Sequence, residues 1–175
     1  NFLNVGRLTY QKNQMLLLKS FNHIKHLNYK LLIIGYGSDE IKLKNYIRTN
    51  KLQNKVKIIN NVSNIDPYLK KSDVFILSSI FEGLPNVLIE AQIKKKFIIS
   101  SNCPTGPKEI LMNGKAGYLF KNNNYLDLKS KIEKFFLNKN TNEIKNKIKY
   151  GFNNLNRFDE KMNLKKYYRL IRKLY

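Results

Sequence analysis

Two glutamates, Glu82 and Glu90, stand on either side of a Gly-Leu-Pro turn in the stretch "FEGLPNVLIEA" (81–91). A carboxylate can accept hydrogen bonds from two hydroxyl groups, which suits the diol of a ribose. Glu90 is therefore a candidate ligand for a ribose, and Glu82 for another part of the same molecule, such as sugar hydroxyls. Either glutamate alone could be an ordinary solvated charge, but the pair around this turn favours a binding site.

The residues after this turn have the pattern of a helix start. Pro85 fits a first helical turn because its missing N–H group would have no partner there. Glu90 follows Asn86 by four residues, so both side chains are expected on one helix face. The N–H groups that present the positive end of the helix dipole are expected to belong to Asn86, Val87 and Leu88.

A second candidate is the basic loop "GRLTYQKN" (6–13), which directly follows an apolar run. Gly6 permits a tight turn, and Arg7 and Lys12 place two cations at or before a helix start. Together with free backbone N–H groups, these cations would suit a diphosphate. The loop alone is weak support, because the chain contains 33 Lys and Arg residues.

The third candidate, "NCPTGPKEIL" (102–111), follows another apolar run. Pro104, Gly106 and Pro107 predict a rigid turn, and Pro107 is expected to start a helix. Thr105 and Gly106 would then face the same cleft. A Pro-Gly turn ahead of a helix needs no ligand, so an ordinary turn remains the alternative.

Short apolar runs alternate with helical patterns along the chain, and continuous runs of this kind fit strands buried on both faces. We predict strands at 1–5, 29–35, 55–60, 72–79, 96–101 and 116–120. We predict helices at 14–27, 39–52, 65–72 and 85–96, followed by a mainly helical tail. This order indicates an α/β fold, a Rossmann-like doubly wound parallel sheet with helices on both faces, in one domain spanning 1–175. Ligands of such sheets bind beyond the carboxyl ends of the strands, where the three candidates fall.

The last segment, "NLKKYYRLIRKLY" (163–175), predicts a basic amphipathic helix. Its apolar face comprises Leu164, Tyr167, Tyr168, Ile171 and Leu174. A helix of this kind could lie on a membrane surface. We favour the commoner arrangement, in which the apolar face packs on a neighbouring domain.

The net charge of +21 would attract polyanions, but the lysines are spread along the chain without an Arg-rich block. A solvated surface is the favoured interpretation, an anionic membrane surface comes second, and no nucleic-acid partner is expected. No apolar run approaches the ~20 residues of a membrane-spanning helix. Cys103 is the single cysteine and is expected to be a partly buried apolar residue. His23 and His26 are expected to be surface residues, and no metal site is predicted.

At these stretches the sequence resembles a known family. It is similar to the C-terminal, donor-binding domain of retaining glycosyltransferases with the GT-B fold, in family four (glycosyl transferases group 1). The resemblance covers almost the whole chain, and its most specific part is "SDVFILSSIFEGLPNVLIEA" (72–91) with the family's Glu-x7-Glu pattern.

The resemblance implies a role for each candidate. Arg7 and Lys12 match the basic pair that grips the diphosphate and stabilises it as the leaving group, with Gly6 beside them. Glu90 matches the ribose ligand, and Glu82 the residue that touches the transferred sugar. Backbone contacts to the donor are implied for Gly83, Leu84 and Pro85, and the base-binding loop for Val62 and Ser63. The residues themselves suggest further donor contacts at Asn86, Val87, Thr105, Gly106 and Phe81, although ordinary packing explains Phe81 equally well.

The resemblance also implies metal-independent transfer with retention of configuration, with no cofactor beyond a nucleotide-sugar co-substrate. We expect a UDP-linked hexose or N-acetylhexosamine as the donor, and a glycan or lipid-linked molecule as the acceptor. The implied location is cytoplasmic, with peripheral contact at the inner face of the membrane as one possibility. The family's acceptor-binding domain is expected to precede residue 1, and this chain alone is not expected to turn over.

Three alternative functions can be compared with this one, and the non-catalytic module is the hardest of them to dismiss. "GYGSDE" (35–40) partly matches a dinucleotide-binding loop, but Glu40 stands where a third glycine should fall. A sugar-nucleotide epimerase related to the GT-B fold would share the sheet and the diphosphate site. A non-catalytic nucleotide-binding module would contain the same nucleotide-binding residues and no acceptor-binding domain.

Overall fold

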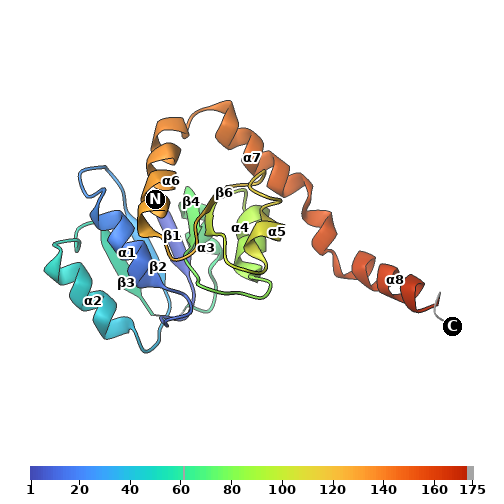
Figure 1. The fold of residues 1–175 in the computed structure, drawn as a ribbon, viewed down its shortest axis with the longest axis horizontal. Coiled ribbons are helices and arrows are strands. Elements are labelled where there is room, and N and C mark those ends of the chain that lie inside the picture. Colours follow the sequence, from blue (N-terminus) through green and yellow to red (C-terminus); the bar gives the residue numbers. More distant parts are fainter. Residues whose placement is uncertain (61, 173–175) are drawn as a thin grey trace.

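The structure is a computed structural model that describes residues 1–60 and 62–172 (for residue 166, the backbone only). Its centre is one parallel sheet with the strand order β3-β2-β1-β4-β5-β6 (Figure 1). All six predicted strands are present. They are β1 (Phe2–Val5), β2 (Leu31–Ile34), β3 (Val56–Ile59), β4 (Val74–Leu77), β5 (Phe97–Ser101) and β6 (Tyr118–Phe120).

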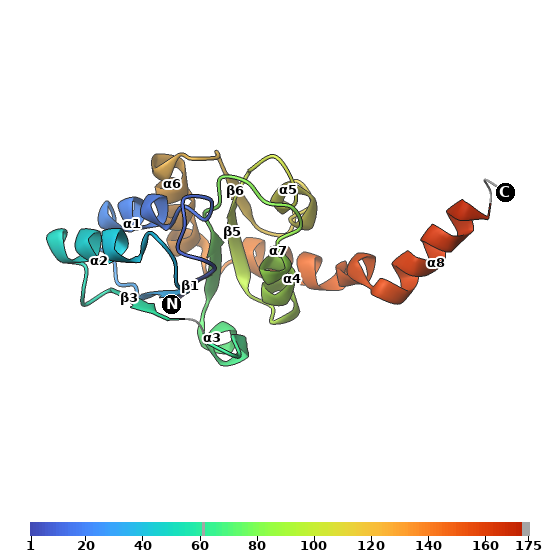
Figure 2. The same cartoon turned by 90° about the horizontal axis from the view of Figure 1, so that it is seen from below.

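Helices cover both faces of this sheet, as predicted for a doubly wound fold. The helices are α1 (Gln14–Asn22), α2 (Glu40–Thr49), α3 (Asp66–Lys71), α4 (Asn86–Ile93), α5 (Pro107–Ile110), α6 (Tyr125–Asn138), α7 (Asn142–Asn153) and α8 (Glu160–Ile171), with a 3₁₀ turn η1 (Leu155–Phe158). The buried side chains of α1, α2 and α6 join one core cluster, and those of α3, α4 and α5 join another. Figure 2 shows α1, α2 and α6 on one side of the sheet and α3 on the other.

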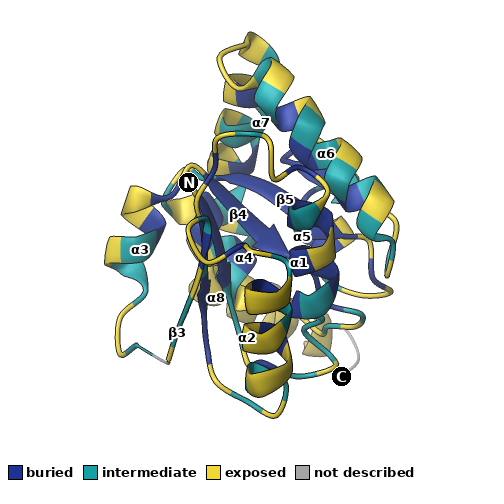
Figure 3. Cartoon of the chain, turned by 90° about the vertical axis from the view of Figure 1, so that its left-hand side faces the viewer, coloured by how far each residue is buried: buried dark blue, intermediate teal, exposed yellow. Residues whose placement is uncertain are grey.

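The strands are mainly apolar because most of their residues are buried. All four residues of β4 and all five of β5 are buried, and Figure 3 shows these two strands in the dark interior. Successive residues of a strand point to opposite faces. Phe75 and Leu77 accordingly enter the core beneath α4, while Val74 and Ile76 enter the core beneath α1 and α6.

The helix ends differ from the predicted ones where the backbone leaves helical geometry. The predicted helix 14–27 ends at Asn22, because residues 23–27 continue only as tight turns. The predicted helix 39–52 ends at Thr49 ahead of Lys51, whose φ is 55°. The predicted helix 85–96 begins one residue later and ends at Ile93, two residues before Lys95 with φ 52°.

The predicted terminal helix begins earlier than expected, at Glu160, because the side chain of Asp159 accepts a hydrogen bond from the N–H of Met162. Figure 1 shows α8 leaving the body of the domain. Leu164, Tyr167, Tyr168 and Ile171 are all exposed, while Leu174 lies outside the described residues. Within the described chain the apolar face of α8 is therefore open. None of the described helices combines the length and apolar character that a membrane crossing requires.

The strand order reverses direction between β1 and β4, which are direct neighbours in the sheet. The connection after β1 leads to β2 on one side, while the connection after β4 leads to β5 on the other. Such a reversal leaves a crevice beyond the carboxyl ends of the two strands, where ligands of open α/β sheets bind. The loops that carry the first two candidate sites, residues 6–13 and 78–85, both start at this point.

Candidate donor-binding site

The first loop is held by direct contact with the loop after β2. The N–H of Leu8 donates to the carbonyl of Tyr36 at 2.8 Å. A Cβ atom on Gly35 would lie 1.9 Å from the carbonyl oxygen of Gly6, and one on Gly37 would lie 2.4 Å from that of Leu8. These two glycines therefore serve close packing of backbone on backbone, which explains them without a dinucleotide.

The two predicted cations of this loop differ in their surroundings. The backbone carbonyl of Arg7 accepts a hydrogen bond from buried Gln14 at 3.0 Å, while its side chain is exposed. Among the described residues the Arg7 guanidinium has no ion-pair partner. Lys12 turns inward instead, and its side chain is 19% exposed. Its alkyl stem passes Gly6, where a Cβ atom would lie 3.6 Å from it.

Lys12 forms an ion pair with Glu82 that the sequence did not predict. Lys12 Nζ lies 2.6 Å from Glu82 Oε1, and the side chain of Glu82 is only 7% exposed. The hydroxyl of Ser79 donates to the same carboxylate oxygen, also at 2.6 Å. A nearly buried carboxylate needs such partners, because desolvation of an unpaired charge is costly. The structure thus brings together Lys12, from the loop after β1, and Glu82, from the loop after β4.

The turn after Glu82 leads into α4 as expected, but with two differences. Pro85 is the N-cap residue with ψ 91°, so the helix begins at Asn86. The N–H of Leu88 donates to the carbonyl of Pro85 at 2.9 Å, so it does not face a ligand. The N–H groups of Asn86 and Val87 have no hydrogen-bond partner among the described residues.

The remaining residues of this stretch line its outer surface. Phe81 and Leu84 are each 51% exposed, and Gly83 is also exposed. Glu90 is exposed on α4, one turn after Asn86, and has no ion-pair partner within the described chain. The carboxylate of Glu90 is therefore open to solvent, whereas that of Glu82 is already occupied by Lys12 and Ser79.

The third candidate loop packs directly on the turn after Glu82. The hydroxyl of Thr105 donates to the backbone carbonyl of Glu82. Gly106 has φ 84°, and a Cβ atom there would lie 2.1 Å from the carbonyl oxygen of Gly83 and 2.6 Å from Pro85 Cδ. Pro107 starts α5, as predicted. The loop thus holds the backbone of Glu82 and Gly83 in position.

We expect Gly106→Ala to lower the free energy of unfolding by about 2 kcal/mol, because the backbone is left-handed and the added methyl meets a carbonyl. Urea denaturation measures this change. Gly83→Ala is the matched control, since no atom lies within 4 Å of its Cβ position. The control should change stability by less than about 0.5 kcal/mol. Equal effects of the two substitutions would contradict the packing described above.

Val62 and Ser63 lie after the end of β3, in a hollow of about 470 Å³ that they share with Asn64, Pro67, Tyr68 and Lys71. No hydrogen bond or ion pair of the described residues connects this hollow with Lys12 or Glu82. Val62 and Ser63 are thus placed at the carboxyl end of the sheet but not drawn into the cluster around Glu82.

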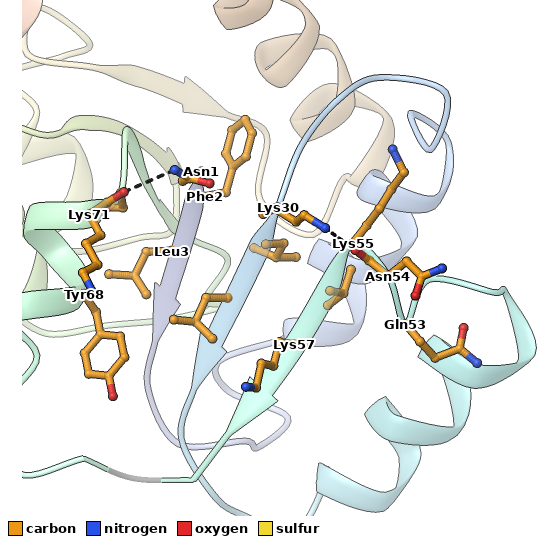
Figure 4. Close-up of a pocket in the computed structure, with 14 residues that line it drawn as sticks. Asn1, Phe2, Leu3, Lys30, Gln53, Asn54, Lys55, Lys57, Tyr68 and Lys71 are labelled. Atoms are coloured by element: carbon orange, nitrogen blue, oxygen red, sulfur yellow. Dashed lines mark hydrogen bonds between the residues drawn. The ribbon is translucent and has the colours of Figure 1, made fainter.

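A hollow of about 540 Å³ lies at the opposite end of the sheet (Figure 4). It is lined by the first residues of β1, β2 and β3, which include Phe2, Leu31 and Val56. Lys30 and Asn54 also line it, and Lys30 Nζ donates to the carbonyl of Asn54 at 2.6 Å. The hollow is therefore remote from the candidate site.

The other residues with possible chemistry have structural surroundings. Cys103 is buried, and burial raises the pKa of its thiol, so it is a neutral apolar residue as expected. His23 and His26 are exposed, also as expected, and His23 stacks on Tyr125. The described residues contain no cluster of three or more His, Cys, Asp or Glu side chains that could hold a metal ion.

Three residues at this site were missed by sequence reasoning. Ser79 binds the Glu82 carboxylate, Gln11 Nε2 donates to the carbonyl of Phe81 at 3.0 Å, and Asn122 Nδ2 donates to that of Ile80 at 2.8 Å. One signal was present in the sequence. Paired serines end two neighbouring apolar runs, Ser78 with Ser79 and Ser100 with Ser101, and buried hydroxyls require partners.

Proteins with similar sequences and folds are glycosyltransferases. The sequence model of the family described as Glycosyl transferases group 1 matches residues 1–152. An uncharacterised glycosyltransferase of Methanocaldococcus jannaschii is 45% identical over 112 residues, which are 63% of this chain and 28% of that protein. An N-acetyl-D-galactosaminyltransferase of Campylobacter jejuni, named for a PP-undecaprenol-linked glycan, is 34% identical over 75% of this chain and 37% of its own length.

A galactosyltransferase of Escherichia coli, named for UDP-Gal and a diphosphoundecaprenol-linked GlcNAc, is 32% identical over 70% of this chain and 33% of its own length. The chain thus spans about a third of the length of these relatives. Among solved structures, a glycosyltransferase of Rickettsia africae has a TM-score of 0.88 and 27% identity, over 98% of this chain and 47% of that one. The pneumococcal O-GlcNAc transferase GtfA shares the fold, with a TM-score of 0.78 at 17% identity over 98% of this chain and 35% of its own. The match over residues 1–152 shows that the chain belongs to the glycosyl transferases group 1 family, and the solved structures show that it has the fold of a GT-B glycosyltransferase domain.

Proposed function

We propose that this chain is the donor-binding half of a retaining, metal-independent hexosyltransferase. It would hold a nucleotide-sugar at the crevice between β1 and β4 while the sugar is transferred to a glycan or lipid-linked acceptor. Arg7 and Lys12 would bind the diphosphate, Glu90 the ribose and Glu82 the transferred sugar. The loop at Val62 and Ser63 would receive the base.

One observation carries this proposal: the ion pair between Lys12 and Glu82, which connects the loops after β1 and β4. It lies where the strand order reverses, and exposed Arg7 stands five residues before Lys12. The two loops therefore carry an ammonium and a carboxylate in contact, and an exposed arginine that has no ion-pair partner among the described residues. Cations of this kind can stabilise the charge that grows on a departing diphosphate, without a metal ion.

The donor is proposed to be a UDP-linked hexose or N-acetylhexosamine. The Escherichia coli relative is named for UDP-Gal, and the Campylobacter jejuni relative for the transfer of N-acetylgalactosamine. Both names also specify acceptors joined through a diphosphate to undecaprenol. A lipid-linked acceptor on the cytoplasmic side of a membrane is therefore proposed here, and a basic surface would favour an anionic bilayer.

A second domain is proposed to complete the cleft and to hold the acceptor. The chain spans 37% of the Campylobacter jejuni relative and 33% of the Escherichia coli relative, which leaves room for such a domain. The exposed apolar face of α8 is a candidate contact with it. Without the acceptor half, the 175-residue chain is expected to bind donor but not to turn over.

The test of this function is a calorimetric titration of the 175-residue chain with UDP and with GDP. We expect saturable binding of UDP, weaker binding of GDP, and loss of at least tenfold in UDP affinity in Glu90→Ala, because the ribose loses a carboxylate acceptor. Glu133→Ala, at a partly exposed position on α6, is a control that also removes one negative charge. Its affinity should equal that of the unchanged chain.

Three outcomes would overturn parts of this proposal. Absence of saturable binding to either nucleotide would contradict the donor-binding function of the chain. Tight binding that survives Glu90→Ala unchanged would contradict the assignment of the ribose to Glu90. A preference for GDP would contradict the proposed uracil base but not the position of the donor site.

A further inference from the structure

We propose that Ser79 is a positioning residue of the donor site, which fixes the carboxylate of Glu82 through its buried hydroxyl. The inference rests on the proposed function, because it takes Glu82 as the residue that touches the donor sugar. Ser79 itself is fully buried and therefore acts through Glu82 rather than on the donor.

The contact between the two side chains is short and protected from water. Ser79 Oγ donates to Glu82 Oε1 at 2.6 Å, the side chain of Glu82 is 7% exposed, and Ser79 is 0% exposed. A hydroxyl group has one hydrogen to donate, and here it is given to a carboxylate. A hydrogen bond to a charged acceptor is stronger than one between neutral groups, and it gains further strength away from water.

The backbone of Ser79 is held by the sheet rather than by the loop. It stands two residues after the end of β4, and its carbonyl accepts a hydrogen bond from Ser101 Oγ at 2.7 Å. Ser101 is the last residue of β5 and is also fully buried. The position of the Ser79 side chain is therefore fixed by two neighbouring strands, β4 and β5.

Glu82, in contrast, lies in an exposed turn. Phe81 and Leu84 beside it are each 51% exposed, so these two side chains do not pack against the core. The carboxylate takes its direction from Ser79 and Lys12, which donate to the same oxygen atom. Ser79 thus connects the end of the sheet to a residue of the turn that follows β4.

The need for Ser79 becomes greatest when donor binds. A diphosphate attracts the ammonium of Lys12 and so competes with Glu82 for it. As Lys12 turns to the diphosphate, Ser79 is the side-chain donor that still holds the carboxylate among the described contacts. Glu82 then stays in place for the sugar hydroxyls instead of following Lys12 or turning to water.

A purely structural role for Ser79 predicts something different. If the hydroxyl only satisfied a buried carboxylate, its removal would lower stability and would weaken all nucleotides equally. If it positions Glu82 for the sugar, its removal weakens a UDP-sugar more than UDP. The ratio of the two affinities, Kd for UDP divided by Kd for the UDP-sugar, separates these roles.

The experiment measures this ratio by calorimetry on the 175-residue chain, with UDP, UDP-galactose and UDP-N-acetylgalactosamine, taking the sugar that binds more tightly. We expect Ser79→Ala to lower the ratio by roughly tenfold, as Glu82→Gln does. The double variant should show no further loss, because Ser79 acts through Glu82. A partly unfolded sample affects both ligands alike, so the ratio remains valid for a less stable variant.

Ser100→Ala is the matched control, since Ser100 is equally buried and its hydroxyl donates to the carbonyl of Ser101 at 3.2 Å and to no other group among the described residues. It should leave the ratio unchanged even if it lowers the melting temperature. A normal ratio in Ser79→Ala beside a lowered one in Glu82→Gln would overturn the inference and leave the proposed function intact. A chain that binds none of the three nucleotides would overturn the proposed function, and the inference with it.

Discussion

Replacing Arg7 with alanine should lower turnover of the complete enzyme, with its acceptor half present, at least tenfold. The guanidinium is exposed beside the crevice and has no ion-pair partner among the described residues, so it is available to a diphosphate. Negative charge on that diphosphate increases as the sugar departs, so the contact is stronger in the transition state than in the bound donor. Single preorganised donors of this kind contribute factors of about 10² to 10³ in kcat.

Steady-state kinetics with varied donor distinguishes this role from simple binding. The kcat should fall by a larger factor than the donor KM rises, because the lost interaction belongs mainly to the transition state. Lys19→Ala removes a cation from an exposed position on α1 and serves as the control. Unchanged turnover in Arg7→Ala would refute the assignment of Arg7 to the leaving group.

Replacing Lys12 with methionine should lower the free energy of unfolding by about 3 kcal/mol, which is a large effect for one side chain at a partly open site. The substitution keeps the apolar stem but leaves the carboxylate of Glu82 nearly buried with Ser79 as its side-chain donor. Removing one partner of a buried ion pair is costly because the other charge stays desolvated. Adding Glu82→Gln should therefore recover about 2 kcal/mol of the loss.

Urea denaturation of the single and double variants measures this coupling. The pair Lys44–Glu40 on α2 is a control with the same separation of 2.6 Å, but its side chains are 57% and 25% exposed. Lys44→Met should cost less than about 0.5 kcal/mol, because exposed pairs of this spacing contribute little. Equal losses at the two lysines, or additive losses in the Lys12–Glu82 cycle, would show that Glu82 is not held as described.

The layers of the fold were predictable because burial on both faces leaves a direct mark on the sequence. A strand such as β4, "VFIL", has no polar face, so its apolar run is continuous. The helix ends were less predictable. Lys51 and Lys95 adopt left-handed backbone angles, which a lysine residue does not favour and which its presence therefore does not predict. The unexpected bond from the Leu88 N–H to Pro85 likewise depends on the local geometry of the cap.

The parts of the candidate site were visible in the sequence, but their contacts were not. Arg7, Lys12, Glu82 and Glu90 stand out by residue type and by their place after apolar runs. The pairing of Lys12 with Glu82 joins residues 70 positions apart, and local patterns carry no information about such a contact. Ser79 was overlooked because a serine at the end of an apolar run looks like a weak strand residue. The donor roles of these residues stay predictions until the measurements above are made.

The strand order of the sheet also determines the sequence in which the strands can pair during synthesis. Lys12 leaves the ribosome 70 residues before Glu82, which at about 5–20 residues per second is an interval of roughly 4 to 14 s. During this time β1 can pair with β2, but its other edge waits for β4. That edge is unpaired during this interval, and an unpaired strand edge can pair with another chain and lead to aggregation. A chain that stalls before residue 74 would therefore leave the edge of β1 unpaired. The ion pair between Lys12 and Glu82 can form only after β4 has been made.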